Sequence, residues 1–158
     1  MKVAKQKSQD LARLAALVRQ MRIGMLTTIE ADGSLRSRPL ETVEVDPEGR
    51  LWFFTQASSP KSARAEADDH QVNLSYADPR DADFASISGT ARVVRDLEKM
   101  RALWSSGLDR WFPRGLDDPD LALLEVRIDK AEYWDEPRNE NVKIGTLPAQ
   151  NQGQRGQH

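Results

Sequence analysis

Two neighbouring stretches decide the fold: Arg36-Ser37-Arg38-Pro39-Leu40, and the segment Leu51-Trp52-Phe53-Phe54-Thr55, which leads into Ser58-Ser59-Pro60-Lys61. Alternate residues of an extended strand point to opposite faces, so the two arginines and Leu40 share one face. The second stretch is apolar on both faces, which predicts a central, buried strand. Asp46-Pro47-Glu48-Gly49 lies between them and is a strong turn signal. Together they predict two antiparallel strands.

The end of the second stretch has the chemistry of a phosphate site. Ser59 can cap a helix whose first residue is Pro60, and the free N–H groups of a helix N-terminus attract anions. Thr55, Ser58 and Ser59 offer short donors, and Lys61 with Arg38 offers positive charge. A phosphate monoester on a small cofactor fits these residues. The same residues also make an ordinary start of a helix after a loop.

Composition excludes several classes of function. The chain has 158 residues, a net charge of -2, no cysteine and two histidines, His70 and His158. We therefore expect no nucleic-acid surface, no thiolate or histidine metal site and no histidine-based triad. The sequence has no apolar run long enough for a membrane span and no apolar signal-peptide core. We expect a cytoplasmic protein without a nucleic-acid or membrane partner.

Hydrophobic periodicity predicts a chain made mostly of strands. Ser8 is the expected cap of a first helix, in which Leu11, Leu14 and Met21 recur at helical spacing. Short helices are expected over 61–69 and 96–104, with Asp96 as cap of the latter. Strands are expected over 23–29, 34–45, 51–56, 72–76, 84–94, 121–128 and 131–134, with Asp129-Lys130 as a bend between the last two.

These elements predict a mainly β (α+β) fold, an antiparallel barrel of about six strands with short flanking helices. Pro39 cannot donate to a ladder, so it marks an edge or a bulge. The glycine fingerprint of a Rossmann sheet is absent. A single domain over 1–137 is expected, followed by a polar tail over 138–158 that is expected to be disordered.

Several segments carry a resemblance to a known family. They occur in the order Leu35-Arg36-Ser37-Arg38-Pro39-Leu40, Leu51-Trp52-Phe53-Phe54-Thr55, Ser59-Pro60-Lys61, Val72-Asn73-Leu74-Ser75-Tyr76, Ser88-Gly89-Thr90-Ala91, Trp111-Phe112-Pro113-Arg114-Gly115 and Glu132-Tyr133-Trp134. The set, over about residues 8–137, resembles the pyridoxamine 5'-phosphate oxidase-like flavoproteins, and among them the bacterial general stress proteins. The resemblance implies an FMN-binding split β-barrel that works as a homodimer, with two flavin sites in the subunit interface.

The resemblance also implies which residues bind the cofactor. Arg38 corresponds to the basic residue near the flavin, and the backbone at Pro39 and Leu40 would run along the isoalloxazine edge. Many relatives have methionine where this chain has Leu40. Phe53 and Thr55 match the strand that leads to the phosphate, and Ser59 and Lys61 match the phosphate-binding turn. Trp134 matches an aromatic that approaches the ring from the partner subunit. Phe53 is read equally well as plain core.

The segment after Trp134 departs from the oxidases that act on pyridoxamine phosphate. Those enzymes carry an arginine- and histidine-bearing tail, whereas this chain continues Asp135-Glu136-Pro137-Arg138. A phosphorylated substrate would meet acidic residues there. We therefore expect a stress-type flavoprotein that oxidises or reduces another small substrate, with no assigned catalytic side chain. The alternatives are a flavin-binding or flavin-sensing module without turnover, a barrel that holds a deazaflavin or haem, and a purely structural dimer.

Overall fold

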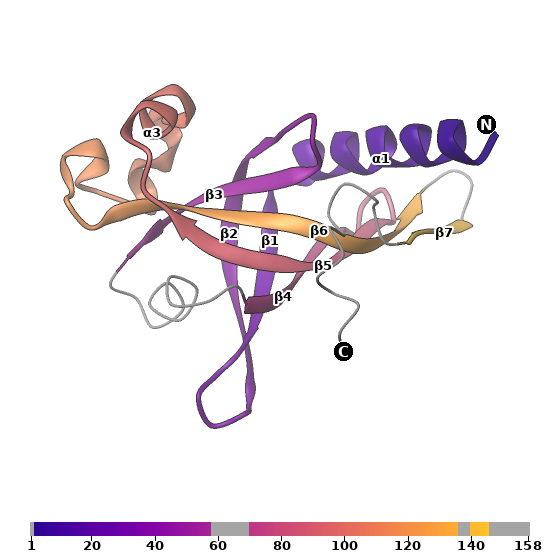
Figure 1. Cartoon of the computed structure of the whole chain (residues 1–158), viewed down its shortest axis with the longest axis horizontal. Helices are drawn as coiled ribbons and strands as arrows, with labels where there is room; N and C mark the ends of the chain where they lie inside the picture. Colours follow the sequence, from indigo (N-terminus) through magenta and orange to yellow (C-terminus); the bar gives the residue numbers. More distant parts are fainter. Residues whose placement is uncertain (1, 58–69, 136–139, 146–158) are drawn as a thin grey trace.

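The computed structural model describes residues 2–57, 70–135 and 140–145, with side chains from residue 9 onward in the first range and from 143 onward in the last. The helices are α1 (Lys2–Met21) and α3 (Leu97–Leu103), with short 3-10 helices η1 (Ser106–Arg110) and η2 (Gly115–Asp117). The strands are β1 (Ile23–Ile29), β2 (Leu35–Val45), β3 (Arg50–Gln56), β4 (His70–Asp78), β5 (Asp83–Val94), β6 (Leu121–Asp135) and β7 (Glu140–Ile144). Figure 1 shows their arrangement.

The strands form one antiparallel sheet in the order β3-β2-β1-β4-β5-β6-β7, and β3 also pairs with β6. This second pairing closes the first six strands of that order into a barrel. β7 pairs with the C-terminal part of β6, from Ala131 to Asp135. The predicted mainly β split barrel is therefore confirmed. Figure 1 shows β6 as a long strand between β3 and β5, with α1 lying along the β7 side of the barrel.

The predicted bend at Asp129-Lys130 is wrong, because β6 is one continuous strand. Its pairing with β5 shifts register where Gly89 faces Ile128 and Ser88 faces Lys130, which leaves Asp129 as the extra residue of a β-bulge. Thr90 Oγ1 donates to Asp129 Oδ2 over 3.0 Å. A bulge bends a strand without ending it, so the polar pair that reads locally as a turn lies inside a ladder.

The start of the first helix differs from the prediction, whereas the start of α3 agrees with it. α1 begins at Lys2, so Ser8 lies inside the helix and is not its cap. Asp96 does cap α3, where its side chain accepts from Lys99 N over 3.1 Å. The expected helix over 61–69 lies outside the described residues, and β7 occupies part of the segment expected to be a tail. Among the described helices, none is both long and apolar enough to cross a membrane.

Two apolar clusters explain why β3 is apolar on both faces. Its inward residues Leu51 and Phe53 join the barrel core, to which α1 contributes Leu14, Leu17 and Val18. Its outward residues Trp52 and Phe54 lie in a second cluster, with Met100 of α3 and Leu108 of η1. The insert of α3, η1 and η2, defined here as residues 97–117, therefore covers the outer face of β3 and the first half of β6. The predicted central, buried strand is confirmed.

The barrel is split between β2 and β3. The two strands pair only from Thr42 opposite Phe53 to Val45 opposite Leu51, with a register shift between Thr42 and Glu44. Over the described residues, the part of β2 before Thr42 pairs with β1 alone. Pro39 lies in this singly paired part, as predicted for a residue that cannot donate to a ladder. Among the described strands, none pairs with the edge of β2 that carries Arg38, Pro39 and Leu40 on the β3 side.

Candidate functional site

Arg38 is the best-defined polar residue at the split. It lies on the inner face of β2, opposite the fully buried Leu26 of β1, and only 14% of its side chain is exposed. Its Nη2 donates to Thr28 Oγ1 over 3.2 Å and to Glu30 Oε2 over 3.4 Å. The strand alternation predicted from the sequence therefore places this cation at the barrel wall, where β1 ends.

The second terminal nitrogen of Arg38 has no partner among the residues that the structure describes. Nη1 is buried and makes no hydrogen bond to any residue that the structure describes. A buried donor left unsatisfied is costly, and a charged one more so. The hydroxyl of Thr28 and, to a smaller degree, the charge of Arg38 hold the pKa of the Glu30 carboxyl below its ordinary value. Nη1 of Arg38 therefore has two desolvated N–H groups available to an oxygen acceptor.

Leu40, Phe53 and Thr55 lie on the inner side of the barrel wall. Leu40 and Phe53 belong to the barrel core, and Phe53 is completely buried. The core interpretation of the Phe53 side chain is thus the one the structure shows, and contact between this residue and a ligand would come from its backbone. Thr55 is 1% exposed, two residues before β3 gives way to the segment that starts at Ala57. These residues shape the wall beside Arg38.

Pro39 and Trp134 lie on the outer face instead. Pro39 is exposed opposite Met25 of β1. Trp134 is half-buried near the end of β6, opposite Phe84 of β5. Trp134 lies beyond the part of β6 that pairs with β3, which ends at Arg127. Within one chain, the structure therefore does not bring Trp134 together with Arg38.

The predicted phosphate turn can be followed only to its start. Ser59 and Lys61 lie outside the described residues, so their role stays a prediction. Ala57, just before the turn, is anchored because its N–H donates to Asp120 O over 2.8 Å. Gln56 Nε2 also donates to Asp118 Oδ2 over 3.3 Å. These two bonds tie the end of β3 to the loop before β6.

Thr28 and Glu30 are the site residues that sequence reasoning missed. Both belong to the hairpin that the sequence predicted, and Thr28 lies opposite Arg36 on the inner face of the sheet. Thr28 Oγ1 donates to Glu30 Oε2 over 2.8 Å, in addition to its contact with Arg38. The available signal was the hairpin register, since diagonal neighbours on one face of a two-stranded ladder come within side-chain reach.

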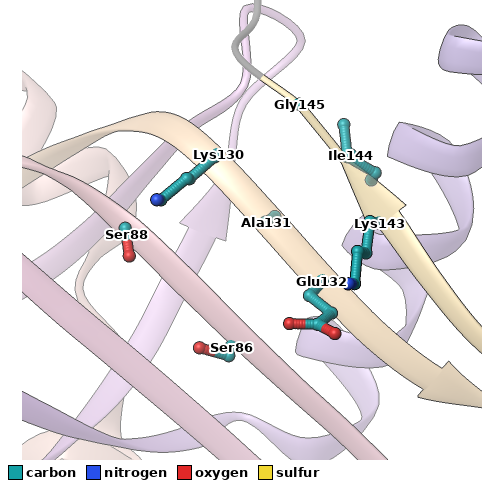
Figure 2. A pocket seen from close by; sticks show the side chains of 8 residues that line it. All are labelled: Ser86, Ser88, Lys130, Ala131, Glu132, Lys143, Ile144 and Gly145. Atoms are coloured by element: carbon teal, nitrogen blue, oxygen red, sulfur yellow. The ribbon is translucent and has the colours of Figure 1, made fainter.

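Two cavities lie away from Arg38. One, of about 320 Å³, opens on the outer face where β5, β6 and β7 meet, and Figure 2 shows Lys130 extending toward Ser88, and Glu132 toward Ser86. The other, of about 340 Å³, lies between the end of α1 and β2, and includes Arg19 and Arg22. Neither is lined by a residue that the sequence predicted for the site.

Comparisons with known proteins found a matching family and similar sequences. Residues 9–155 match the family described as pyridoxamine 5'-phosphate oxidase like. Protein bli-3 of Neurospora crassa is 28% identical over 149 residues, which cover 88% of this chain and 71% of bli-3. In Bacillus subtilis, General stress protein 26 is 40% identical over 43 residues, which cover 27% of this chain and 30% of that protein.

Solved structures agree in fold. The general stress FMN/FAD binding protein of Xanthomonas citri is 30% identical, with a TM-score of 0.65 over 82% of this chain and 89% of that one. A Clostridium acetobutylicum protein related to general stress protein 26 has a TM-score of 0.71 at 21% identity, over 87% of this chain and 94% of that one. The match over nearly the whole barrel, together with the split beside Arg38, leads to one conclusion. The chain belongs to the pyridoxamine 5'-phosphate oxidase-like family, in its general stress protein branch.

Proposed function

We propose that this protein binds FMN and is a cytoplasmic, general stress-type oxidoreductase acting on a small substrate. The observation that carries the proposal is the buried Nη1 of Arg38, which has no hydrogen-bond partner in the described part of the chain and lies beside the singly paired edge of β2. A flavin has carbonyl oxygens and a phosphate that can accept from its N–H groups, so the residues present fit the cofactor. The Xanthomonas citri relative, described as FMN/FAD binding, supports the choice of a flavin.

Each described residue has a role in the proposed site. Arg38 would donate to a flavin oxygen, the backbone at Pro39 and Leu40 would face the ring edge, and Phe53 and Thr55 would support the wall. Ser59 and Lys61 remain the proposed phosphate ligands. Bound flavin would supply the redox chemistry, while the protein supplies binding, orientation and a local electric field.

Titration with FMN tests the cofactor assignment. The purified protein should quench the fluorescence of added FMN with a dissociation constant in the micromolar range or tighter. Arg38→Ala removes a charge-assisted hydrogen bond, generally about 1.5–3 kcal/mol, so FMN should bind roughly 10- to 150-fold more weakly. Absence of binding by the unaltered protein at micromolar FMN would overturn the proposal.

Arg36→Ala is the matched control for Arg38→Ala. Arg36 lies on the same strand and face, carries the same charge and is exposed. Its removal changes the net charge equally but leaves the buried donor in place. FMN affinity should therefore stay within about twofold of the original, since exposed charges are screened by solvent and salt. Equal losses in both variants would mean that general charge, and not the Nη1 contact, attracts the ligand.

Vitamin B6 oxidation is not part of the proposal. Arg13 of α1 donates to both carboxylate oxygens of Asp135, each over 2.7 Å, just after Trp134. The acidic residue expected to repel a phosphorylated substrate is thus paired with a cation of its own chain. The proposed substrate is still not pyridoxamine phosphate, because the arginine- and histidine-bearing tail of those oxidases has no counterpart in the sequence. Anaerobic reduction of the FMN-loaded protein by NADH or NADPH separates an oxidoreductase from a flavin-sensing module.

We also propose that the working form is a homodimer. Trp134 and Arg38 lie on opposite faces of the barrel wall in one chain, so a flavin site that uses both needs a second copy. The outer faces of β1 and β2 expose Ile23, Met25, Ile29 and Leu35, a gathering of apolar side chains that is typical of interfaces. This proposed interface lies on the side of the barrel that the insert leaves open.

A further inference from the structure

The outer faces of β1, β4, β5 and β6 form one continuous surface. Their pairing registers place Met25, Ser75, Ser86 and Glu132 opposite one another, in a single row that crosses the four strands. These side chains are exposed or half-buried, whereas Leu74, next to Ser75 on β4, is completely buried in the barrel core. Because β4 is the middle strand of the order β2-β1-β4-β5-β6, it divides this outer surface into two halves.

The two halves have complementary shapes. On one side of β4, Met25 and Ile29 of β1 are 41% and 49% exposed, and these large apolar side chains project from the sheet. On the other side lies the cavity of about 320 Å³ where β5, β6 and β7 meet. Figure 2 shows the short side chains of Ser86 and Ser88 on the strand that forms one side of this cavity. One half therefore offers apolar projections, and the other half a recess that can receive them.

The two halves also carry opposite charges. The hairpin that joins β1 and β2 carries Glu30 and Asp32, whereas Lys130 lines the cavity (Figure 2). Through β4 and β5, the registers place Lys130 in the same row as Thr27, three residues before Glu30. A second copy that exchanged the two halves would bring its acidic hairpin toward Lys130. Charge complementarity of this kind favours one orientation of two partners over others.

A half-turn about an axis along β4 exchanges the two halves. In a two-fold dimer the same patch of both copies meets itself, so residue i contacts residue j, and j contacts i. A twisted sheet is saddle-shaped, and this half-turn leaves the saddle unchanged, so two such surfaces match in shape. β1 of one copy then lies over β5 of the other, and β2 lies over β6, the strand that carries Trp134.

We propose that β1 and β2 of a second copy cover the cavity at β5, β6 and β7, around a two-fold axis that runs along β4 at Ser75. Met25 of each copy then packs against Ser86 of the other, and Ser75 lies opposite Ser75 of the other copy. This inference rests on the proposed homodimer and adds its axis and its contacts. Each proposed flavin site would have β2 of one copy as one wall, and β6 of the other copy, with Trp134, as the facing wall.

A single cysteine tests the axis, because the chain has no cysteine of its own. Ser75→Cys changes the side chain little, and a thiol on a two-fold axis meets the same thiol of the other copy. Oxidation by oxygen, with copper phenanthroline as catalyst, should join the two thiols in a disulfide, and the oxygen takes up their two electrons and two protons. We expect most of the protein to run as a linked dimer on a non-reducing gel. A short bis-maleimide, which tolerates a wider gap than a disulfide, should give the same result.

A pair of cysteines tests the contact between β1 and β5. In the double variant Met25→Cys/Ser86→Cys, the two thiols of one chain lie two strands apart, about 9.5 Å, which is too far for a disulfide within that chain. Each thiol should instead join its counterpart in the other copy. The double variant should therefore form a linked dimer, and neither single variant should. Leu97→Cys, at a position 52% exposed on α3 of the insert, is the control and should stay unlinked.

The outcomes separate this inference from the proposed homodimer. Light scattering under reducing conditions and thermal melting first establish whether each variant is folded and dimeric. A monomeric original protein overturns the homodimer, and the inference with it. If the original protein is dimeric but either Ser75→Cys or the double variant stays unlinked while folded and dimeric, only the axis is wrong, and the flavin site keeps its own titration as its test.

Two further results are decisive. If Met25→Cys alone links as completely as the double variant, the axis lies at β1 and the inference is overturned. If Ser75→Cys is monomeric when reduced, the double variant decides, because its cysteines lie on either side of the axis and not on it.

Discussion

Asp46 shows how one buried carboxylate can organise a turn. It is 8% exposed and accepts from the backbone N–H groups of Glu48 and Arg50, over 3.0 and 2.9 Å. It also accepts from Arg50 Nε and Trp52 Nε1, both over 3.0 Å. One side chain thereby satisfies two backbone donors and two side-chain donors at the start of β3. The turn predicted from Asp46-Pro47-Glu48-Gly49 is held by this network.

This network makes stability depend on pH. Burial alone would raise the pKa of Asp46, but the hydrogen bonds from Trp52 and Arg50 and the charge of Arg50 outweigh burial, and the folded-state pKa lies below its ordinary value of 3.8. Its contribution to stability is therefore full above about pH 4 and is lost as pH falls through the folded-state pKa. We expect Asp46→Asn to have a lower free energy of unfolding than the original protein at pH 7. Between pH 3 and 7, measured with urea, this free energy should also depend less on pH than that of the original protein.

The exposed Asp109 of η1 offers a control for that comparison. Asp109→Asn should have the same pH profile of stability as the original protein. If the free energies of unfolding of Asp46→Asn and the original protein differed by the same amount at every pH, the stabilising effect of the carboxylate would not depend on pH in this range, and the prediction would be wrong.

At the scale of elements, the insert of residues 97–117 explains the double burial of β3. Phe54 meets Trp104 edge to face at 5.3 Å, and Trp111 Nε1 donates to Glu41 Oε1 of β2 over 2.9 Å. The Glu41 carboxylate also pairs with Arg22, which follows α1. The insert is thus packed on β3 by apolar contacts and tied to β2 by a hydrogen bond, so it is an integral layer of the domain.

Leu108→Ala tests whether the insert is integral. Leu108 is 1% exposed within the second apolar cluster, and truncating such a leucine costs about 2–5 kcal/mol. We expect a loss of this size in urea unfolding, and faster amide exchange in the insert than in β4. Leu116→Ala, at a position that is 40% exposed, should cost much less. Similar small losses in both variants would show that the insert contributes little to the core.

At the scale of the molecule, the barrel has one covered and one open outer side. The insert covers β3 and the first half of β6, while Ile23, Met25, Ile29 and Leu35 remain exposed on β1 and β2. Trp134 lies on the outer face near the end of β6, opposite Phe84 of β5. The proposed dimer would cover apolar surface and bring Trp134 of one copy to the split of the other.

Met25→Glu tests the proposed interface. Met25 is 41% exposed in the middle of β1, and a charge there would be buried without a partner in a dimer. We expect light scattering after size-exclusion chromatography to show a dimer for the original protein and a monomer for Met25→Glu, with weakened FMN binding. Leu97→Glu, at an exposed position on α3 of the insert, should remain dimeric. A monomeric original protein, or a dimeric Met25→Glu, would place the interface elsewhere or exclude it.

Local signals in the sequence were enough for most elements. A run of β-forming residues identified the first strand, and alternation identified the second, fourth and fifth. Gly33, with a φ of 89°, closes the predicted hairpin, and Asp96 caps α3 as predicted. The same alternation placed Arg38 and Leu40 on one face. These features depend on neighbours within a few residues, so composition and spacing are sufficient to reveal them.

Other features were decided only by the tertiary structure. Asp129-Lys130 reads as a turn until pairing with β5 makes it a bulge, and the β3–β6 ladder that closes the barrel joins residues far apart in the chain. The buried state of Arg38 Nη1 depends likewise on the whole wall around it. The sequence by itself determined the first five strands, the face of Arg38 and the family resemblance. Closure, the split and the burial of Arg38 needed the fold, because burial and long-range pairing depend on contacts that no local window of sequence contains.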